Sequence, residues 1–198
     1  MTGVPEIEVD LDVAAEERWA SLHAWRSSAR AVLRFYVTDL GGLQDFRPML
    51  MSYCEEYVDK EYAAEMRGVA RVLDAPEEEV VLANLYYDAL KFLLGQGSLG
   101  CTGFVVSAAS GALHARNLDW TTADGLLASE TVVFNFRRGR GPILYRIVGW
   151  PGFIGCFSGV APGRFAVTLN AVLSDDPPRF WRTHGYYGTA SGSGTLYR

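Results

Sequence analysis

A cysteine and two charged residues stand at the ends of two short apolar runs in the middle of the chain. Cys101 begins the first run, and Arg116 and Asp119 stand near the end of the second. The polar turn Ala109-Ser110-Gly111 is typical of a tight connection between two strands, so the strands should lie side by side. The thiol would then lie near the charged groups, and a cation beside a thiol favours the reactive thiolate. The pattern predicts a nucleophilic cysteine.

The position of Cys101 also favours self-cleavage. It follows the glycine-bearing stretch 95–100, where its thiol would attack the carbonyl of Gly100 and form a thioester that water opens. The new α-amine of Cys101, which titrates near ~8 in peptides, would then serve as a general base without any histidine. The alternative is a papain-like enzyme that pairs Cys101 with His114 or His184, and the lack of a local papain-type signature counts against it.

The elements that must position these residues change in character near residue 100. Residues 6–13 alternate acidic and apolar side chains, which predicts a strand with one solvent-exposed face or an extended arm on the sheet. Helices are predicted over 14–40, over 43–73 with a break near Pro48, and over 80–94 with its start at Asp74-Ala75-Pro76. Further strands are predicted over 131–137, 143–148, 153–157 and 164–173. We therefore expect an α+β fold with a helical part (1–100), a sheet part (101–173) and an irregular tail (174–198).

Composition excludes several classes of protein. The 198 residues are 49% apolar with a formal net charge of -5, which allows a sizeable core and argues against nucleic acid as a partner. Three cysteines without a C-x-x-C pattern support neither a disulfide framework nor a structural zinc site. Neither a signal peptide nor an apolar run of about 20 residues is visible. We expect a soluble cytoplasmic protein.

Several segments, taken together, resemble one family. In chain order they are Glu16-Glu17-Arg18-Trp19, Asn84-Leu85-Tyr86-Tyr87, Cys101-Thr102, His114-Ala115-Arg116-Asn117-Leu118-Asp119 and residues 152–170. Over residues 6–173 the chain resembles the acid ceramidase and N-acylethanolamine acid amidase family of N-terminal-nucleophile hydrolases. That family is similar in catalytic logic to bile salt hydrolases and penicillin V acylases.

The resemblance implies a proenzyme cleaved between Gly100 and Cys101, and a sheet part that belongs to an αββα sandwich. Matched residue by residue, Cys101 would be the nucleophile, Arg116 and Asp119 would position and polarise it, and Asn170 would lie in the oxyanion hole. The strand pattern agrees, because alternating apolar residues share one face of the run and Asn170 points to the other. An amide donor there would be worth on the order of 3 kcal/mol to the transition state.

The resemblance further implies hydrolysis of a small N-acyl amide, such as a ceramide-like or N-acylethanolamine-like lipid, without a metal or organic cofactor. The α- and β-parts would stay associated. The basic turn 137–141 is predicted to be a solvated hairpin turn, with a transient contact with a membrane surface as the alternative. Family members continue beyond the segment that matches this chain, so an incomplete sandwich is expected. The alternative is a shortened, inactive homologue that acts as a binding or assembly module.

Overall fold

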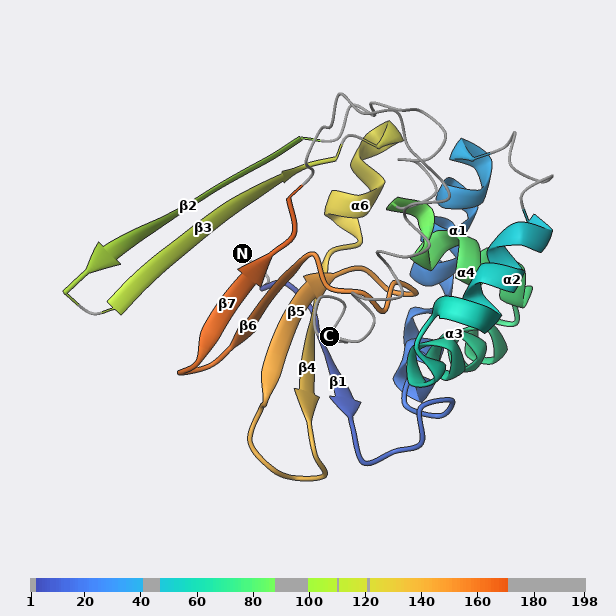
Figure 1. Cartoon of the computed structure of the whole chain (residues 1–198), viewed down its shortest axis with the longest axis horizontal. Coiled ribbons are helices and arrows are strands. Elements are labelled where there is room, and N and C mark those ends of the chain that lie inside the picture. The colour runs from blue at the N-terminus through green and yellow to red at the C-terminus, as the bar shows by residue number, and fades with distance from the viewer. Residues whose placement is uncertain (1–2, 41–46, 88–99, 110, 121, 171–198) are drawn as a thin grey trace.

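The computed structural model describes residues 3–40, 47–87, 100–109, 111–120 and 122–170 (Figure 1). Its described part contains a five-stranded sheet, a set of helices on one face of that sheet, and a separate two-stranded hairpin. This mixture of helix and sheet confirms the predicted α+β class. Among these described residues, no helix has the length and apolar character that crossing a membrane requires.

The five-stranded sheet combines a strand from the start of the described chain with strands from its second half. Its strands lie in the order β1 (Glu6–Asp10), β4 (Val132–Arg137), β5 (Tyr145–Gly149), β6 (Ser158–Ala161) and β7 (Phe165–Thr168). β1 runs parallel to β4, and every other neighbouring pair is antiparallel. The alternation in residues 6–13 predicted β1 correctly, since Ile7 and Val9 are buried while Glu6 and Glu8 are exposed.

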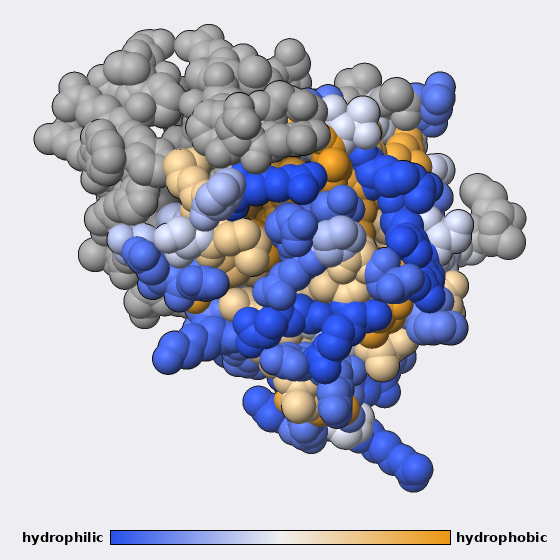
Figure 2. Space-filling view, turned by 90° about the vertical axis from the view of Figure 1, so that its right-hand side faces the viewer, coloured by the Kyte–Doolittle hydropathy of each residue, from blue (hydrophilic) through white to orange (hydrophobic). Residues whose placement is uncertain are grey.

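The helices pack on the face of the sheet that carries Ile7, Val9 and Phe134 (Figure 1). They are η1 (Ala20–Trp25), α1 (Arg26–Asp39), α2 (Arg47–Tyr57), α3 (Lys60–Leu73) and α4 (Glu77–Asn84), with the short η3 (Ala123–Gly125) and α6 (Leu126–Ser129) nearer the sheet. Trp19 meets Phe134 edge to face at 5.4 Å between ring centroids. The helical side of the molecule is largely hydrophilic on its outer surface (Figure 2).

The segment 16–19 fastens the loop after β1 to α3. The buried Arg18 pairs with Glu65 of α3, and its Nη1 also lies 2.8 Å from Glu61 Oε1. The indole of Trp19 donates to the other oxygen of Glu65 at 3.0 Å. A buried charge needs a partner to offset its lost hydration, so this network fixes the loop on the helix.

Two predicted helix boundaries were wrong. Residues 48–73 do not form one helix: α2, with Pro48 in its first turn, ends at Tyr57, and residues 43–46 of the prediction lie outside the described residues. The next helix, α3, begins after Asp59, whose side chain accepts hydrogen bonds from the N–H groups of Glu61 and Tyr62. Asp74 does not cap α4; it ends α3 in a left-handed conformation and pairs with Arg26 at 2.9 Å.

The predicted start of α4 is otherwise confirmed, with Glu77 to Glu79 in its first turn. α4 ends at Asn84, Tyr86 and Tyr87 are again helical after a bend at Leu85, and residues 88–94 of the prediction lie outside the described residues. The long helix predicted over 14–40 is also shorter than expected. It divides into the 3-10 helix η1 and the α-helix α1, and turns precede η1.

The strand predicted over 153–157 is wrong. These residues are buried but irregular, and β6 begins only at Ser158. The buried side chain of Asn84 explains why. Its amide nitrogen donates to the Gly152 carbonyl at 3.0 Å, and its oxygen accepts from the Ile154 N–H at 2.9 Å. A side chain of α4 thus supplies the partners that a neighbouring strand would otherwise provide.

The hairpin agrees with the prediction of two paired strands. β2 (Gly100–Ala108) and β3 (Gly111–Asp119) are antiparallel and form a sheet of their own, which extends away from the helices (Figure 1). Their register places Cys101 opposite Leu118, Gly103 opposite Arg116, and Gly100 opposite Asp119.

Candidate active site

One face of the hairpin lies on the side of the five-stranded sheet that the helices leave open. On β5, Ile147 is only 3% exposed against the helices, whereas Val148 points the other way and is 47% exposed. Ser158 of β6 and Thr168 of β7 stand in the same row as Val148, so they share its open face. Both hydroxyls make hydrogen bonds with side chains of the hairpin.

Two side chains of β3 make those contacts. The Nη1 atom of Arg116 donates to Ser158 Oγ at 2.6 Å, and His114 Nε2 lies 3.3 Å from Thr168 Oγ1. Because side chains alternate along a strand, His114 and Arg116 share one face of β3, and Cys101 belongs to that face by register. Cys101 therefore lies on the side of the hairpin that meets β6 and β7.

Arg116 contacts the thiol of Cys101. Its Nη2 atom lies 3.4 Å from Cys101 Sγ and donates to the Leu169 carbonyl at 2.8 Å. The sulfur itself lies 3.9 Å from the same carbonyl oxygen. Cys101 and Arg116 are both half-buried, so solvent screens their interaction only in part. A guanidinium in this position stabilises a thiolate.

Asp119 occupies the opposite face of the hairpin. Its carboxylate accepts a hydrogen bond from the Asn117 amide and lies beside Gly100, where a Cβ would stand 3.6 Å from Asp119 Oδ2. Asp119 is therefore next to the peptide that joins Gly100 to Cys101, on the side away from the thiol. This location suits an interaction with the backbone nitrogen of Cys101 better than one with its sulfur.

Asn170 follows β7 by two residues and is exposed. A Cβ on Gly103 would lie 3.7 Å from Asn170 Nδ2, and Gly103 shares a hairpin face with Cys101. The structure thus gathers Cys101, Arg116 and Asn170 on one side of the hairpin, near the end of β7. The side chain of Asp119 lies across the strand from them.

Two further groups of the site were missed by sequence reasoning: the Ser158 hydroxyl and the Leu169 carbonyl. Both bind the guanidinium of Arg116. They fall within residues 152–170, which the family resemblance marked as a whole, but no local pattern distinguishes either residue. His114 contacts Thr168 rather than the thiol, and His184, the other histidine of the papain-like alternative, lies outside the described residues.

The other two cysteines have a different environment. Burial raises the pKa of Cys54 to about 11. Burial also raises the pKa of Cys156 to about 11, although the guanidinium of Arg116 acts in the opposite direction. Both thiols stay protonated near neutral pH, and a protonated thiol is a poor nucleophile.

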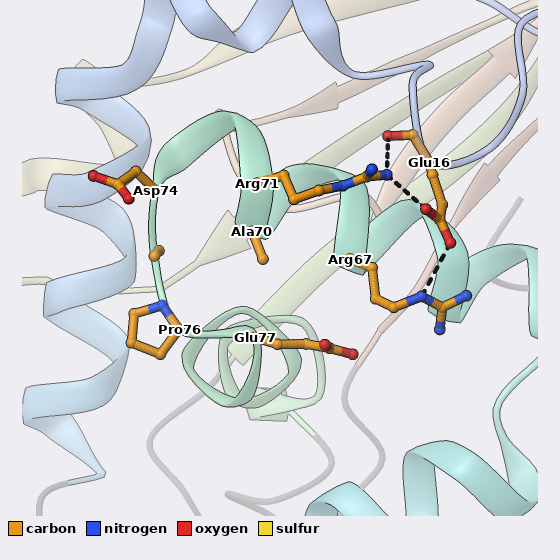
Figure 3. Close-up of a pocket in the computed structure, with 8 residues that line it drawn as sticks. Glu16, Arg67, Ala70, Arg71, Asp74, Pro76 and Glu77 are labelled. Carbon is orange, nitrogen blue, oxygen red and sulfur yellow. Dashed lines mark hydrogen bonds and ion pairs between the residues drawn. The ribbon is translucent and has the colours of Figure 1, made fainter.

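A hollow of about 760 Å³ lies on the helical side, between α3 and the start of α4 (Figure 3). Three of its charged side chains are paired with one another, because Glu16 accepts from Arg67 at 3.2 Å and from Arg71 at 2.6 Å. None of its lining residues belongs to the hairpin or to β7. Among the described residues, no group of three or more His, Cys, Asp or Glu side chains could hold a metal ion.

The basic turn after β4 is also partly neutralised. Arg137 pairs with Glu8 of β1, and Arg138 Nη1 lies 2.9 Å from Asp12 Oδ1. These arginines therefore hold the turn against the segment that contains β1, and their charges are shared with acids of this chain.

Comparison with known proteins places this site in context. No family model matches the chain. An acid ceramidase from Balaenoptera acutorostrata scammoni is 26% identical over 196 residues, which cover 86% of this chain and 46% of the relative. An N-acylethanolamine-hydrolyzing acid amidase from Caenorhabditis elegans is 33% identical over 137 residues, or 67% of this chain and 37% of the relative. An acid ceramidase from Bos taurus is 30% identical over 128 residues, which cover 58% of this chain and 30% of the relative.

This chain is homologous to acid ceramidases and N-acylethanolamine-hydrolyzing acid amidases. The resemblance predicted from the sequence is therefore confirmed. The chain spans less than half the length of each of these three relatives. By their names, the homologues are enzymes that act on ceramide or hydrolyse N-acylethanolamines.

Proposed function

We propose that this chain carries the nucleophile and the activating groups of an N-terminal-nucleophile cysteine amidohydrolase for fatty-acyl amides, of the ceramide or N-acylethanolamine type. The observation that carries the proposal is the contact between Arg116 Nη2 and Cys101 Sγ at 3.4 Å. Burial raises the pKa of the other two thiols, Cys54 and Cys156, to about 11, even though each has an arginine that acts in the opposite direction. The homology to lipid amidases supports the substrate class.

The first reaction in the proposal is self-cleavage. The sulfur of Cys101 attacks the carbonyl carbon of Gly100, the C–N bond breaks, and the nitrogen takes up a proton to become the α-amine of Cys101. Water then opens the thioester, which yields the carboxylate of Gly100 and the free thiol. Asp119 lies beside Gly100, so its carboxylate is placed to accept a hydrogen bond from the new amine.

The second reaction uses the same thiol on a substrate. The α-amine takes the thiol proton, and the thiolate attacks the amide carbonyl of the lipid. The side-chain amide of Asn170 and a backbone N–H hold the oxyanion. The leaving amine takes a proton from the α-ammonium group, and water hydrolyses the acyl-thioester. None of these steps uses a metal or an organic cofactor.

We also propose that the layers described above belong to an αββα sandwich. The helices, the five-stranded sheet and the hairpin would be its first three layers in that order. The proposal divides the chain into an α-part over 1–100 and a β-part over 101–173. It is supported by the contacts of Arg116 and His114 with the open face of β6 and β7.

The proposal predicts that the purified chain cleaves itself between Gly100 and Cys101. We expect intact-mass measurements, after incubation across acidic to neutral pH, to show two fragments that join at this bond. The matched control is Cys101→Ala, which should remain uncut. Cleaved protein should then release fatty acid from N-acylethanolamines or ceramides. An uncut wild-type chain under every condition would overturn self-processing.

A further inference from the structure

The guanidinium of Arg116 is held from two directions. Its Nη1 atom donates to Ser158 Oγ at 2.6 Å, and its Nη2 atom donates to the Leu169 carbonyl at 2.8 Å. The Nη2 atom also faces the Cys101 sulfur. We propose that Ser158 is a positioning residue that aims Arg116 at the thiol of Cys101. This inference rests on the proposed role of Cys101 as the nucleophile.

Ser158 is well placed to act as an anchor. It is the first residue of β6, which lies between β5 and β7, and the register sets it beside Val148 on one strand and Thr168 on the other. A strand paired on both sides moves little. The arginine, by contrast, comes from the separate hairpin through a long side chain with many rotamers, which a fixed acceptor restricts.

The shape of the guanidinium makes this anchor directional. The group is planar and rigid, so fixing Nη1 on Ser158 also fixes the plane in which Nη2 lies. The Leu169 carbonyl alone leaves the group free to rotate about its contact. Among the described residues, Ser158 is the one that offers Arg116 a side-chain oxygen. Arg116 thus connects Ser158 of the five-stranded sheet to the thiol of Cys101.

A purely structural role makes a different prediction. If the Ser158 hydroxyl only docked the hairpin on the sheet, the neighbouring hydroxyl of Thr168 would matter in the same way, because it contacts His114 of the same strand. The side-chain hydrogen bond of Thr168 is with His114 rather than with Arg116 or Cys101. The two hydroxyls lie in one row, so they form a matched pair for an experiment.

The test compares Ser158→Thr with Ser158→Val in the full chain. These side chains have nearly the same shape, suit a strand equally well, and differ in the hydroxyl. The readout is the rate at which iodoacetamide alkylates Cys101, measured across pH by mass spectrometry of the peptide. We expect the valine variant to react about threefold to tenfold more slowly near neutral pH, as the net loss of one ordinary hydrogen bond predicts. The threonine variant should react like the wild type.

Two further variants separate this inference from the function on which it rests. Arg116→Ala should slow alkylation at least as much as Ser158→Val, and Thr168→Val should not slow it. Slow reaction in Arg116→Ala but not in Ser158→Val would overturn the role of Ser158 and leave the proposed nucleophile intact. No change in either would overturn the activation of Cys101 by Arg116. Equal slowing in Thr168→Val and Ser158→Val would show that both hydroxyls only dock the hairpin.

Discussion

At the scale of the residue, the three cysteines of this chain are distinguished by what surrounds each sulfur. Cys101 has a guanidinium beside it, whereas Cys54 and Cys156 are buried in the core. Burial in an apolar environment disfavours the charged thiolate. The same residue type is therefore a candidate nucleophile at one position and a packing residue at the other two.

This contrast gives a prediction for the folded Cys101→Ala chain. The pKa values of Cys54 and Cys156 are raised from an ordinary 9.0 to about 11. At pH 8 each thiol should hold about a hundredfold less thiolate than in the unfolded chain. Alkylation of both should therefore be slower by at least that factor in buffer than in concentrated urea, as measured by peptide mass spectrometry. Comparable rates in the two conditions would contradict the burial of these thiols.

The sign of the linked stability change follows from the same shift. The folded state keeps its thiol protons up to about pH 11, whereas the unfolded state begins to lose them near pH 9.0. Between these values the folded state binds more protons, so the free energy of unfolding falls as pH rises. Below about pH 9 the contribution of the two thiols is fully present.

Residue spacing predicted part of the site and missed the rest for a physical reason. Cys101 and Arg116 belong to one hairpin, so a turn and two strands suffice to bring them to the same face, whereas Asp119 of that hairpin lies on the other face. Ser158 meets Arg116 across 42 positions of the chain. That contact depends on how two separate sheets pack against each other, and such packing cannot be predicted from the pattern of neighbouring residues in the sequence. Asn170 reached the candidate site through the family resemblance.

At the scale of the element, α3 comes very close to the loop after β1. The carbonyl and carboxylate of Glu16 accept hydrogen bonds from Arg71 at 3.2 and 2.6 Å, and Arg67 adds another at 3.2 Å (Figure 3). Gly68 lies on the same helix directly under Glu16, and a Cβ added there would overlap the Glu16 carbonyl oxygen. The glycine is therefore needed for the close approach of the two backbones.

We predict that Gly68→Ala lowers the free energy of unfolding, although alanine is the better helix former. The propensity gain is about 1 kcal/mol, but the methyl group forces the backbone of residue 16 away and breaks its bonds with α3. A net loss of about 1–3 kcal/mol is expected from overpacking of this kind, measured by urea denaturation. Ser27→Ala, at an exposed position of α1, should change stability by less than about 0.5 kcal/mol. A stabilised Gly68→Ala variant would contradict the close contact.

Elements with strong local signals were predictable, and those set by distant partners were not. The alternation of residues 6–13 predicted β1, and the turn at 109–111 predicted the hairpin. Residues 153–157 are as apolar as a strand, yet the amide of Asn84 satisfies their backbone and keeps them irregular. At residues 153–157 a partner distant in the sequence therefore accounts for the irregular conformation. Asp74 is a residue type that often caps the start of a helix. In the structure it instead ends α3 and pairs with Arg26 of another helix.

At the scale of the whole molecule, the two parts on either side of Gly100 share one core. β1 comes from the first part, yet its partner β4 comes from the second, with five residue pairs between Glu6↔Val133 and Asp10↔Arg137. Trp19 packs on Phe134 and Phe136 at 5.4 and 6.0 Å between ring centroids. Asn84 bonds to Gly152 and Ile154 from across the core. Cleavage before Cys101 would break none of these contacts.

We therefore predict that the fragments 1–100 and 101–198 stay together after cleavage. To test this whether or not the chain cleaves itself, a protease recognition sequence can be inserted between Gly97 and Ser98 of the Cys101→Ala chain. After digestion the two pieces should elute as one species from a size-exclusion column in buffer and separate in concentrated urea. Burial of a shared apolar core is what holds them, because removing such surface from water provides most of the free energy of association.

A more specific prediction concerns the hydrogen bonds of Asn84, which connect the two parts across the core. Asn84→Leu keeps the side chain's size but leaves the Gly152 carbonyl and the Ile154 N–H without their partner inside the protein. Each unsatisfied buried group costs about 1–3 kcal/mol. The digested variant should therefore dissociate at a lower urea concentration than digested protein with Asn84. Fragments that separate in plain buffer even with Asn84 present would show that the continuous chain, rather than the shared core, holds the two parts together.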